Sequence, residues 1–206
     1  FVYAMSQAPD DGWTSLQTIG LTALAVALVV LFVWKERRTT SPLMPLDLFG
    51  VRPVFVANVV GFCIGATIFG GFFLLSLYMQ QVLGYSAIKA GLAFLATAGT
   101  TIPAAGLAQM LVTRIGVKPV MAIGLGLMAV AYLWYTQLPT DGSFWKHLFV
   151  PYVVSGIGLP FSFIPVSLAA LSNLEERIAG VASGLLNASQ QIGGALGVAI
   201  ASTIGS

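Results

Sequence analysis

Charged residues divide this chain into long uncharged runs, and their spacing constrains the fold more than any other feature. A helix needs about 20 apolar residues to cross a bilayer, so each run is long enough for one crossing and too short for two. The runs cover residues 12–34, 53–88, 90–113, 119–140, 147–174 and 178–206. We therefore expect an all-α membrane protein, a multi-span helical bundle with about six spans.

The composition supports a membrane protein and argues against several other classes. Hydrophobic residues make up 57% and charged residues 8% of the 206 residues, whereas soluble domains hold about 25% charged residues. The net charge of +2 is too small to favour nucleic acid as a partner. The chain has one histidine, His147, and one cysteine, Cys63, which is too few for a metal cluster. We expect a bilayer partner, no metal or cofactor, and no enzyme activity, because the runs hold no acid/base pair.

The distribution of Lys and Arg predicts the orientation of the spans, because cytoplasmic loops retain basic residues. Seven of the nine lie in alternate connections, at residues 35–52, 114–118 and 177, and only Lys89 and Lys146 lie in the others. We expect the chain to start outside the cell. It begins with Phe1 and ends at Ser206 within an apolar run, so we expect a fragment of a longer protein.

Two runs carry polar and small residues along one side of the predicted helix. In the last run, at about 100° per residue, this side holds Gly180, Ser183, Gly184, Asn187, Gln190, Gln191, Gly194, Gly197, Ala201, Ser202 and Gly205. In the second run, the stripe runs from Asn58 through Phe72 and Ser76 to Gln80 and includes a Gly61-xxx-Gly65 spacing. Such faces either pack helices together or line a pathway, and both interpretations stay open.

Prolines predict distortion in the third and fifth runs. Pro103 removes a backbone donor from the third helix, and Pro160 and Pro165 do the same in the fifth. Pro160 also clashes with the carbonyl of Gly156, so we expect the fifth helix to be bent or locally broken at mid-membrane. These four residues are candidates for a kink or gate, although prolines in membrane helices also serve packing alone.

Four segments resemble the drug/proton antiporters of the major facilitator superfamily, in its fourteen-helix branch. They are Gly180-Val-Ala-Ser-Gly-Leu-Leu-Asn187 followed by Gln190, Gln191 and Gly193-Gly-Ala-Leu-Gly197; Leu77-Tyr-Met-Gln-Gln-Val-Leu-Gly-Tyr-Ser86; Tyr3-Ala-Met-Ser-Gln7 to Trp13; and Glu36-Arg-Arg to Pro42-Leu-Met-Pro-Leu-Asp-Leu-Phe49. The resemblance implies the C-terminal part of that fold, with the N-terminal half of the same transporter as partner.

The resemblance also implies a division of the chain. Residues 1–52 are the tail of a preceding span, an outer loop, one inserted linker span and a cytoplasmic loop, and residues 53–206 are a transporter bundle of five spans whose final helix is missing. The family's signature cytoplasmic turn has a degenerate counterpart here. Arg114, Gly116 and Lys118 fit it, but Gln109 and Thr113 replace a Gly and an Asp, which argues against a charge-relay gating role.

These observations together predict a transmembrane transporter, and the resemblance implies that it lies in a bacterial inner or plasma membrane. The resemblance implies proton-coupled efflux of amphipathic drugs or other small organic substrates by alternating access. Because the runs contain no charged residue, we expect the proton-coupling residues elsewhere in the longer protein. We expect the substrate cavity to use amides, hydroxyls and aromatic rings, namely Asn58, Phe72, Ser76, Gln80, Phe161, Phe163, Asn187, Gln190 and Gln191. The alternative is a non-catalytic membrane scaffold or an uncoupled channel fragment.

Overall fold

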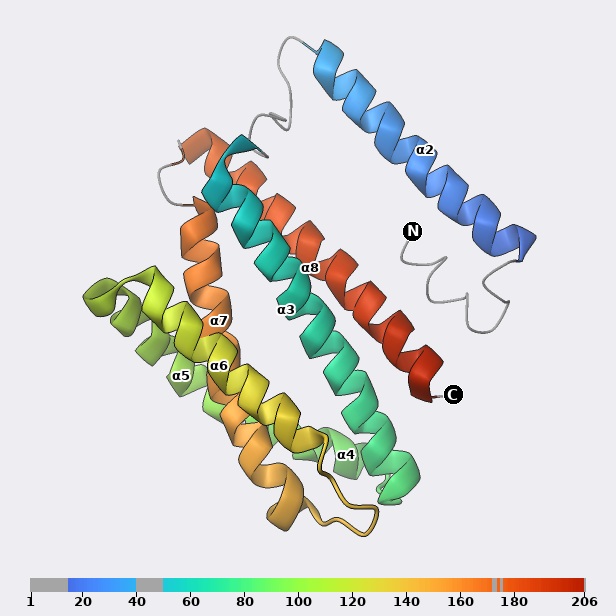
Figure 1. Cartoon of the computed structure of the whole chain (residues 1–206), viewed down its shortest axis with the longest axis vertical. Coiled ribbons are helices and arrows are strands. Elements are labelled where there is room, and N and C mark those ends of the chain that lie inside the picture. Colours follow the sequence, from blue (N-terminus) through green and yellow to red (C-terminus); the bar gives the residue numbers. More distant parts are fainter. Residues whose placement is uncertain (1–14, 40–49, 172–173, 175, 206) are drawn as a thin grey trace. The chain divides into compact units, whose positions relative to one another are not determined.

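A computed structural model of the chain describes residues 15–39, 50–171, 174 and 176–205. Within these residues every regular element is helical (Figure 1). The elements are α2 (Leu16–Arg38), α3 (Arg52–Leu77), the π-helical turn η2 (Tyr78–Val82), α4 (Ala87–Ala93), α5 (Leu95–Ile115), α6 (Val117–Tyr135), the π-helical turn η3 (Phe144–Leu148), α7 (Phe149–Leu171) and α8 (Glu176–Gly205). The predicted helical class is confirmed. The predicted preceding span and outer loop at residues 1–14 and most of the cytoplasmic loop at 40–49 lie outside the described residues.

Five helical segments in the described part of the chain are long and apolar enough to cross a membrane. They are Ile19–Arg38, Arg52–Val82, Ala87–Ile115, Val117–Tyr135 and Phe144–Leu171. Each overlaps one of the first five uncharged runs and extends beyond it only by a few residues that include charged ones, so the spacing of the charges predicts where the spans lie. Helix α8 has 30 residues, which is long enough to cross, but its Asn and Gln side chains make it less apolar. We count it as the sixth span by its length and by its packing along α3.

The described helices form two compact units. The terminal unit comprises α2, α3 up to Leu74, and the chain from Ala170 onward, which includes α8. The central unit comprises Leu75–Ala169, which holds η2, α4, α5, α6, η3 and most of α7. The predicted division at residue 52, between a linker part and a transporter bundle, follows a different criterion and stays a prediction.

Local chemistry sets several helix ends in the central unit. The Ser86 Oγ accepts a hydrogen bond from the Lys89 N–H at 3.3 Å and caps the start of α4. Gly116 connects α5 to α6 with φ of 88° and ψ of 169°, a conformation that is essentially restricted to glycine. The third span is interrupted at Phe94, between α4 and α5, and not at Pro103. Of the two outcomes expected for the fifth span, a break is not seen, because α7 is continuous through Pro160 and Pro165.

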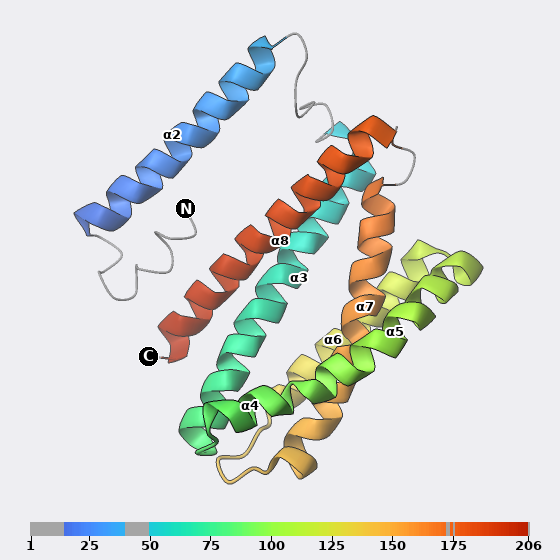
Figure 2. The same cartoon turned by 180° about the vertical axis from the view of Figure 1, so that it is seen from behind.

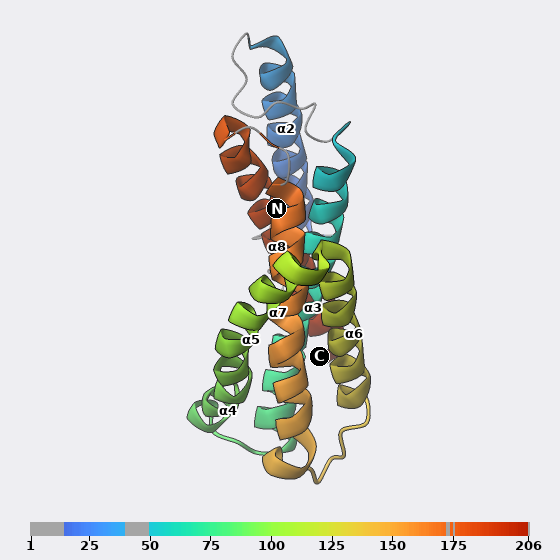
Figure 3. The ribbon, with the colours of Figure 1, turned by 90° about the vertical axis from the view of Figure 1, so that its left-hand side faces the viewer.

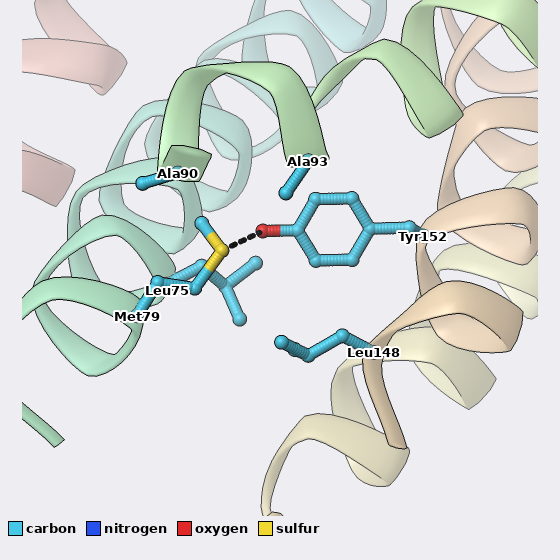
Figure 4. Packing of buried hydrophobic residues seen from close by; sticks show 6 residues of the cluster. All are labelled: Leu75, Met79, Ala90, Ala93, Leu148 and Tyr152. Atoms are coloured by element: carbon cyan, nitrogen blue, oxygen red, sulfur yellow. Dashed lines mark hydrogen bonds between the residues drawn. The ribbon is translucent and has the colours of Figure 1, made fainter. Parts of the chain in front are cut away.

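The core of the central unit lies where α7 meets its neighbours. Near η2 and η3, the buried cluster in Figure 4 contains Leu75, Met79, Ala90, Ala93, Leu148 and Tyr152. The Tyr152 hydroxyl donates to the Met79 Sδ at 3.7 Å, so even the polar end of this ring has a partner. Toward the other end, α7 lies between α5 and α6 (Figure 3), and Phe161 packs against Ala104, Ala108 and Val120.

Candidate functional site

Helices α3 and α8 lie side by side in the terminal unit with their backbones in contact (Figure 1, Figure 2). A Cβ at Gly70 would lie 2.9 Å from the carbonyl oxygen of Gly197, and a Cβ at Gly193 would collide with the backbone of Phe62. Small residues allow helices in a membrane to approach this closely. The glycines on the two helices that use this property are Gly61, Gly65, Gly70, Gly193, Gly194 and Gly197.

A hydrogen bond also joins the two helices. The Ser189 hydroxyl on α8 donates to the Asn58 Oδ1 on α3 at 2.7 Å, and the Asn58 Nδ2 donates to the Val54 carbonyl at 2.9 Å. Asn58 is buried, with 7% of its surface exposed. Asn58 therefore links α3 to α8, and its contact with substrate stays a prediction. Ser189 was not among the candidates, because its partner lies 131 residues away in the sequence.

Gln190 faces the same interface but its amide is not satisfied. Its Cγ would lie 3.5 Å from a Cβ at Gly61, and its Nε2 is buried without a hydrogen-bond partner in the described structure. A buried donor left in this state costs about 1–3 kcal/mol. An acceptor, such as a water or a group from outside the described residues, is therefore needed beside Gln190.

The polar stripe predicted on α8 divides into two faces. Leu186, Gln190 and Gly193 lie against α3, whereas Asn187 and Gln191 are exposed. We call the second surface, made of Gly180, Gly184, Asn187 and Gln191, the open face of α8. Its spacing of four, three and four residues keeps it on one side of the helix, and a Cβ at either glycine would meet nothing within 4 Å.

The remaining candidates on the second span lie toward its other end. Phe72 is 37% exposed on α3. In the central unit, the Gln80 Nε2 donates to the Ser76 Oγ at 2.8 Å, so these two residues form a local pair one helical turn apart. The structure brings Ser76 and Gln80 together, while Asn58 belongs to the α3–α8 interface in the terminal unit.

Helices α5 and α7 are joined through the carbonyl that Pro160 leaves without a helical donor. Pro160 has no N–H for the Gly156 carbonyl, and the Thr101 hydroxyl on α5 donates to this carbonyl at 3.0 Å. Next to it, the Thr97 hydroxyl donates to the Tyr152 carbonyl at 3.2 Å. Thr97 and Thr101 are polar residues of the third uncharged run, but the sequence alone does not identify their partners on α7.

The other α7 candidates are packed to different degrees. Phe161 is buried between α5 and α6, with 7% of its surface exposed, and Pro165 is fully buried. Phe163 is half-buried on the same helix, and Pro103 is exposed on α5. A Cβ at Gly156 would collide with the Thr100 side chain, so Gly156 lies in a tight helix contact. Phe161, Pro165 and Gly156 fit packing, and the kink, gate and cavity roles stay predictions.

The turn between α5 and α6 holds the three predicted cytoplasmic residues together. Arg114 lies in the last turn of α5 and Lys118 in the first turn of α6, and both side chains are exposed. Gly116 between them has the positive φ described above. The structure thus gives Gly116 a conformational reason to be glycine, which is independent of any gating role.

Comparison with known proteins identifies the family. The sequence model of the Major Facilitator Superfamily matches residues 10–198. The tetracenomycin C resistance and export protein of Streptomyces glaucescens is 32% identical over 205 residues, which cover 97% of this chain and 37% of that protein. The lincomycin resistance protein of Streptomyces lincolnensis is 32% identical over 204 residues, which cover 99% of this chain and 42% of that protein. The multidrug resistance protein Stp of Mycobacterium tuberculosis is 30% identical over 208 residues, with 98% and 37% covered.

These proteins are longer than this chain, which spans about two-fifths of their length. The match nevertheless extends across almost all of the present sequence and includes the helices described above. The chain belongs to the major facilitator superfamily of membrane transporters.

Proposed function

We propose that this chain is part of an exporter of amphipathic organic compounds, in which the open face of α8 supplies neutral hydrogen-bonding groups to the substrate pathway. The proposal depends mainly on one observation: Asn187 and Gln191 stay exposed while the adjacent Gln190 packs against α3. An amide in contact with lipid is costly, so a spanning helix turns such a face toward protein or water.

The names of the relatives support this class of substrate. One relative is named for export of tetracenomycin C and another for resistance to lincomycin. Amide side chains donate and accept hydrogen bonds without charge, so they suit neutral or variably charged organic molecules. Phe72, exposed on α3, adds an aromatic surface of the kind that such molecules contact in binding pockets.

Proton coupling and alternating access complete the proposal. In this family such transport involves two helical bundles that rock about a site near the middle of the membrane. The uncharged runs of this chain contain no group that titrates as a carboxylate does. The N-terminal half of the longer transporter would therefore contain the coupling residues and the opposite wall of the pathway, in the bacterial inner or plasma membrane.

The test replaces the two exposed amides together, Asn187→Leu and Gln191→Leu, in the full-length transporter that contains this chain. Two lost hydrogen bonds of about 0.5–1.5 kcal/mol each should weaken apparent substrate affinity about 5- to 150-fold. Efflux of tetracenomycin C and lincomycin is measured as resistance in a pump-deficient host, and as uptake into everted vesicles with and without an imposed pH gradient.

Gln109→Leu is the matched control, because it makes the same change at an exposed amide on α5, outside the open face of α8. The control should retain transport, and all variants should reach the membrane in equal amounts. Unchanged efflux in the double variant would refute a role of the open face in the pathway. Efflux that is insensitive to the pH gradient would refute proton coupling but leave the pathway assignment intact.

A further inference from the structure

The central unit contains a pocket that the proposed transport does not use. It has a volume of about 520 Å³ and lies beside the starts of α4, α5 and η3, within the range of about 300–1,000 Å³ that is usual for small-molecule sites. Its walls are aromatic and aliphatic, and one cation lies among them. The residues that matter for its chemistry are Lys89, Leu92, Leu95, Phe144, Trp145 and Phe149.

Ring contacts and one hydrogen bond hold the aromatic wall in place. Trp145 lies 5.2 Å from Phe149 and 5.4 Å from Phe144, measured between ring centroids. The Phe144 N–H donates to the Tyr85 hydroxyl at 3.2 Å, which fixes η3 against the turn that precedes α4. These contacts therefore fix the shape of the wall.

Lys89 is held at this wall by the same tyrosine. Its Nζ lies 3.7 Å from the centroid of the Tyr85 ring, in a cation–π contact. The N–H donors of the ammonium group that do not face the ring can still bind an anion. Lys146 and His147 lie in η3 and Asp141 lies in the connection before it, but none of the three lines the pocket. The His147 Nδ1 is occupied, because it accepts a hydrogen bond from the Ser143 N–H.

The position of the pocket indicates the headgroup layer of the membrane. It lies at the ends of two spans, and basic residue spacing predicts that these ends are on the outer side. Trp145 is 74% exposed, and indole rings in membrane proteins prefer this layer. Farther along the helices, Leu92 is 59% and Leu95 is 61% exposed, so the pocket continues onto an exposed apolar surface.

We propose that this pocket binds an anionic phospholipid of the outer leaflet. The Lys89 ammonium contacts the lipid phosphate, and Leu92, Leu95 and Phe149 contact the start of an acyl chain. A lysine is a compact point charge that suits a phosphate, and no carboxylate lines the pocket to compete for it. The inference does not depend on which compounds the transporter exports.

Tryptophan quenching in nanodiscs tests this assignment with the full-length protein. Brominated phosphatidylglycerol and brominated phosphatidylcholine are compared at equal mole fractions, and the Trp145 signal is obtained by subtracting the Trp145→Phe variant. A basic residue near an anionic lipid surface contributes about 1 kcal/mol, so phosphatidylglycerol should be preferred about fivefold. Lys89→Gln should abolish the preference, Lys89→Arg should keep it, and Lys146→Gln should keep most of it.

Equal quenching by the two lipids, or a preference that survives Lys89→Gln, would overturn the proposal. Excess sodium phosphate at matched ionic strength should change nothing; displacement by it would assign Lys89 to a free anion instead. Displacement by tetracenomycin C or lincomycin would make the pocket part of the substrate pathway. As a measurement without tryptophan, native mass spectrometry should show less retained phosphatidylglycerol for Lys89→Gln and for the pocket-filling variant Ala96→Leu.

Discussion

Replacing Thr101 by Val should loosen the contact between α5 and α7, because it removes the donor for the Gly156 carbonyl. Valine has nearly the same shape as threonine, so packing changes little and the hydroxyl is the main loss. The Thr101 hydroxyl has a single proton to share between two acceptors, because its Oγ1 lies 3.0 Å from the Gly156 oxygen and 2.8 Å from the Thr97 oxygen. The Thr97 carbonyl also accepts from the Thr100 hydroxyl at 2.9 Å, so the Gly156 carbonyl loses more.

The magnitude follows from two opposing effects. A buried carbonyl left without a donor costs about 1–3 kcal/mol. Hydrogen bonds between membrane helices are worth less on average, about 0.6 and at most about 1.7 kcal/mol, because the unfolded helices also find partners. The Gly156 carbonyl has no helical donor to return to, since Pro160 lacks an N–H. We therefore expect a loss of about 1–2 kcal/mol, at the upper end of the membrane values.

The assay is a double-mutant cycle on the full-length protein, unfolded by increasing mole fractions of SDS in mixed micelles. Pro160→Ala restores an N–H at the position that donates to the Gly156 carbonyl in a regular helix. In that background Thr101→Val should cost about 1 kcal/mol less than in the unmodified protein. Thr101→Ser, which keeps the hydroxyl, is the control. If Thr101→Val costs the same in both backgrounds, the proline-freed carbonyl is not what Thr101 stabilises.

Two further predictions concern the contact between α3 and α8. Gly193→Val should lower the free energy of unfolding by about 1–3 kcal/mol or more, because the new side chain meets the α3 backbone. Gly126→Val should not lower it, because nothing lies within 4 Å of a Cβ at that position. Equal midpoints of SDS unfolding for the two variants would contradict this. Ser189→Ala should lower the free energy of unfolding by about 1 kcal/mol, since it leaves the buried Asn58 Oδ1 on α3 without its donor. Ser202→Ala should cost less than half of that, because the Ser202 hydroxyl donates to a carbonyl of its own helix.

The number and approximate limits of the spans could be predicted because charged residues lie only at or near their ends. The helices in the described residues agree with the uncharged runs to within a few residues, and the ends are marked by residues with local reasons, such as Ser86 and Gly116. The interruption at Phe94 could not be predicted. It has no proline or glycine signal at the residue itself, and it occurs where Phe94 packs on Tyr152, with ring centroids 5.4 Å apart.

The candidate site was predicted less completely, for a geometric reason. Gln190 and Gln191 are adjacent, so their side chains point about 100° apart on a helix. A stripe that contains both is wide enough to meet two different surroundings, and periodicity alone cannot tell which residue faces a neighbour. The structure separates them: Gln190 packs against α3 and Gln191 is exposed. Partners such as Ser189 and Thr101 depend on tertiary packing between distant segments, which local sequence does not encode.

The two faces of α8 have different consequences for movement in the proposed transport cycle. Where α8 contacts α3, a Cβ on either helix would collide with backbone, so the pair cannot slide without losing close packing along several turns. Alternating access requires other surfaces to separate and meet again. The open face fits this requirement, because Asn187 and Gln191 are exposed and can bond water when no partner lies against them. The tight face should therefore stay intact during transport, and the open face should be where contacts change.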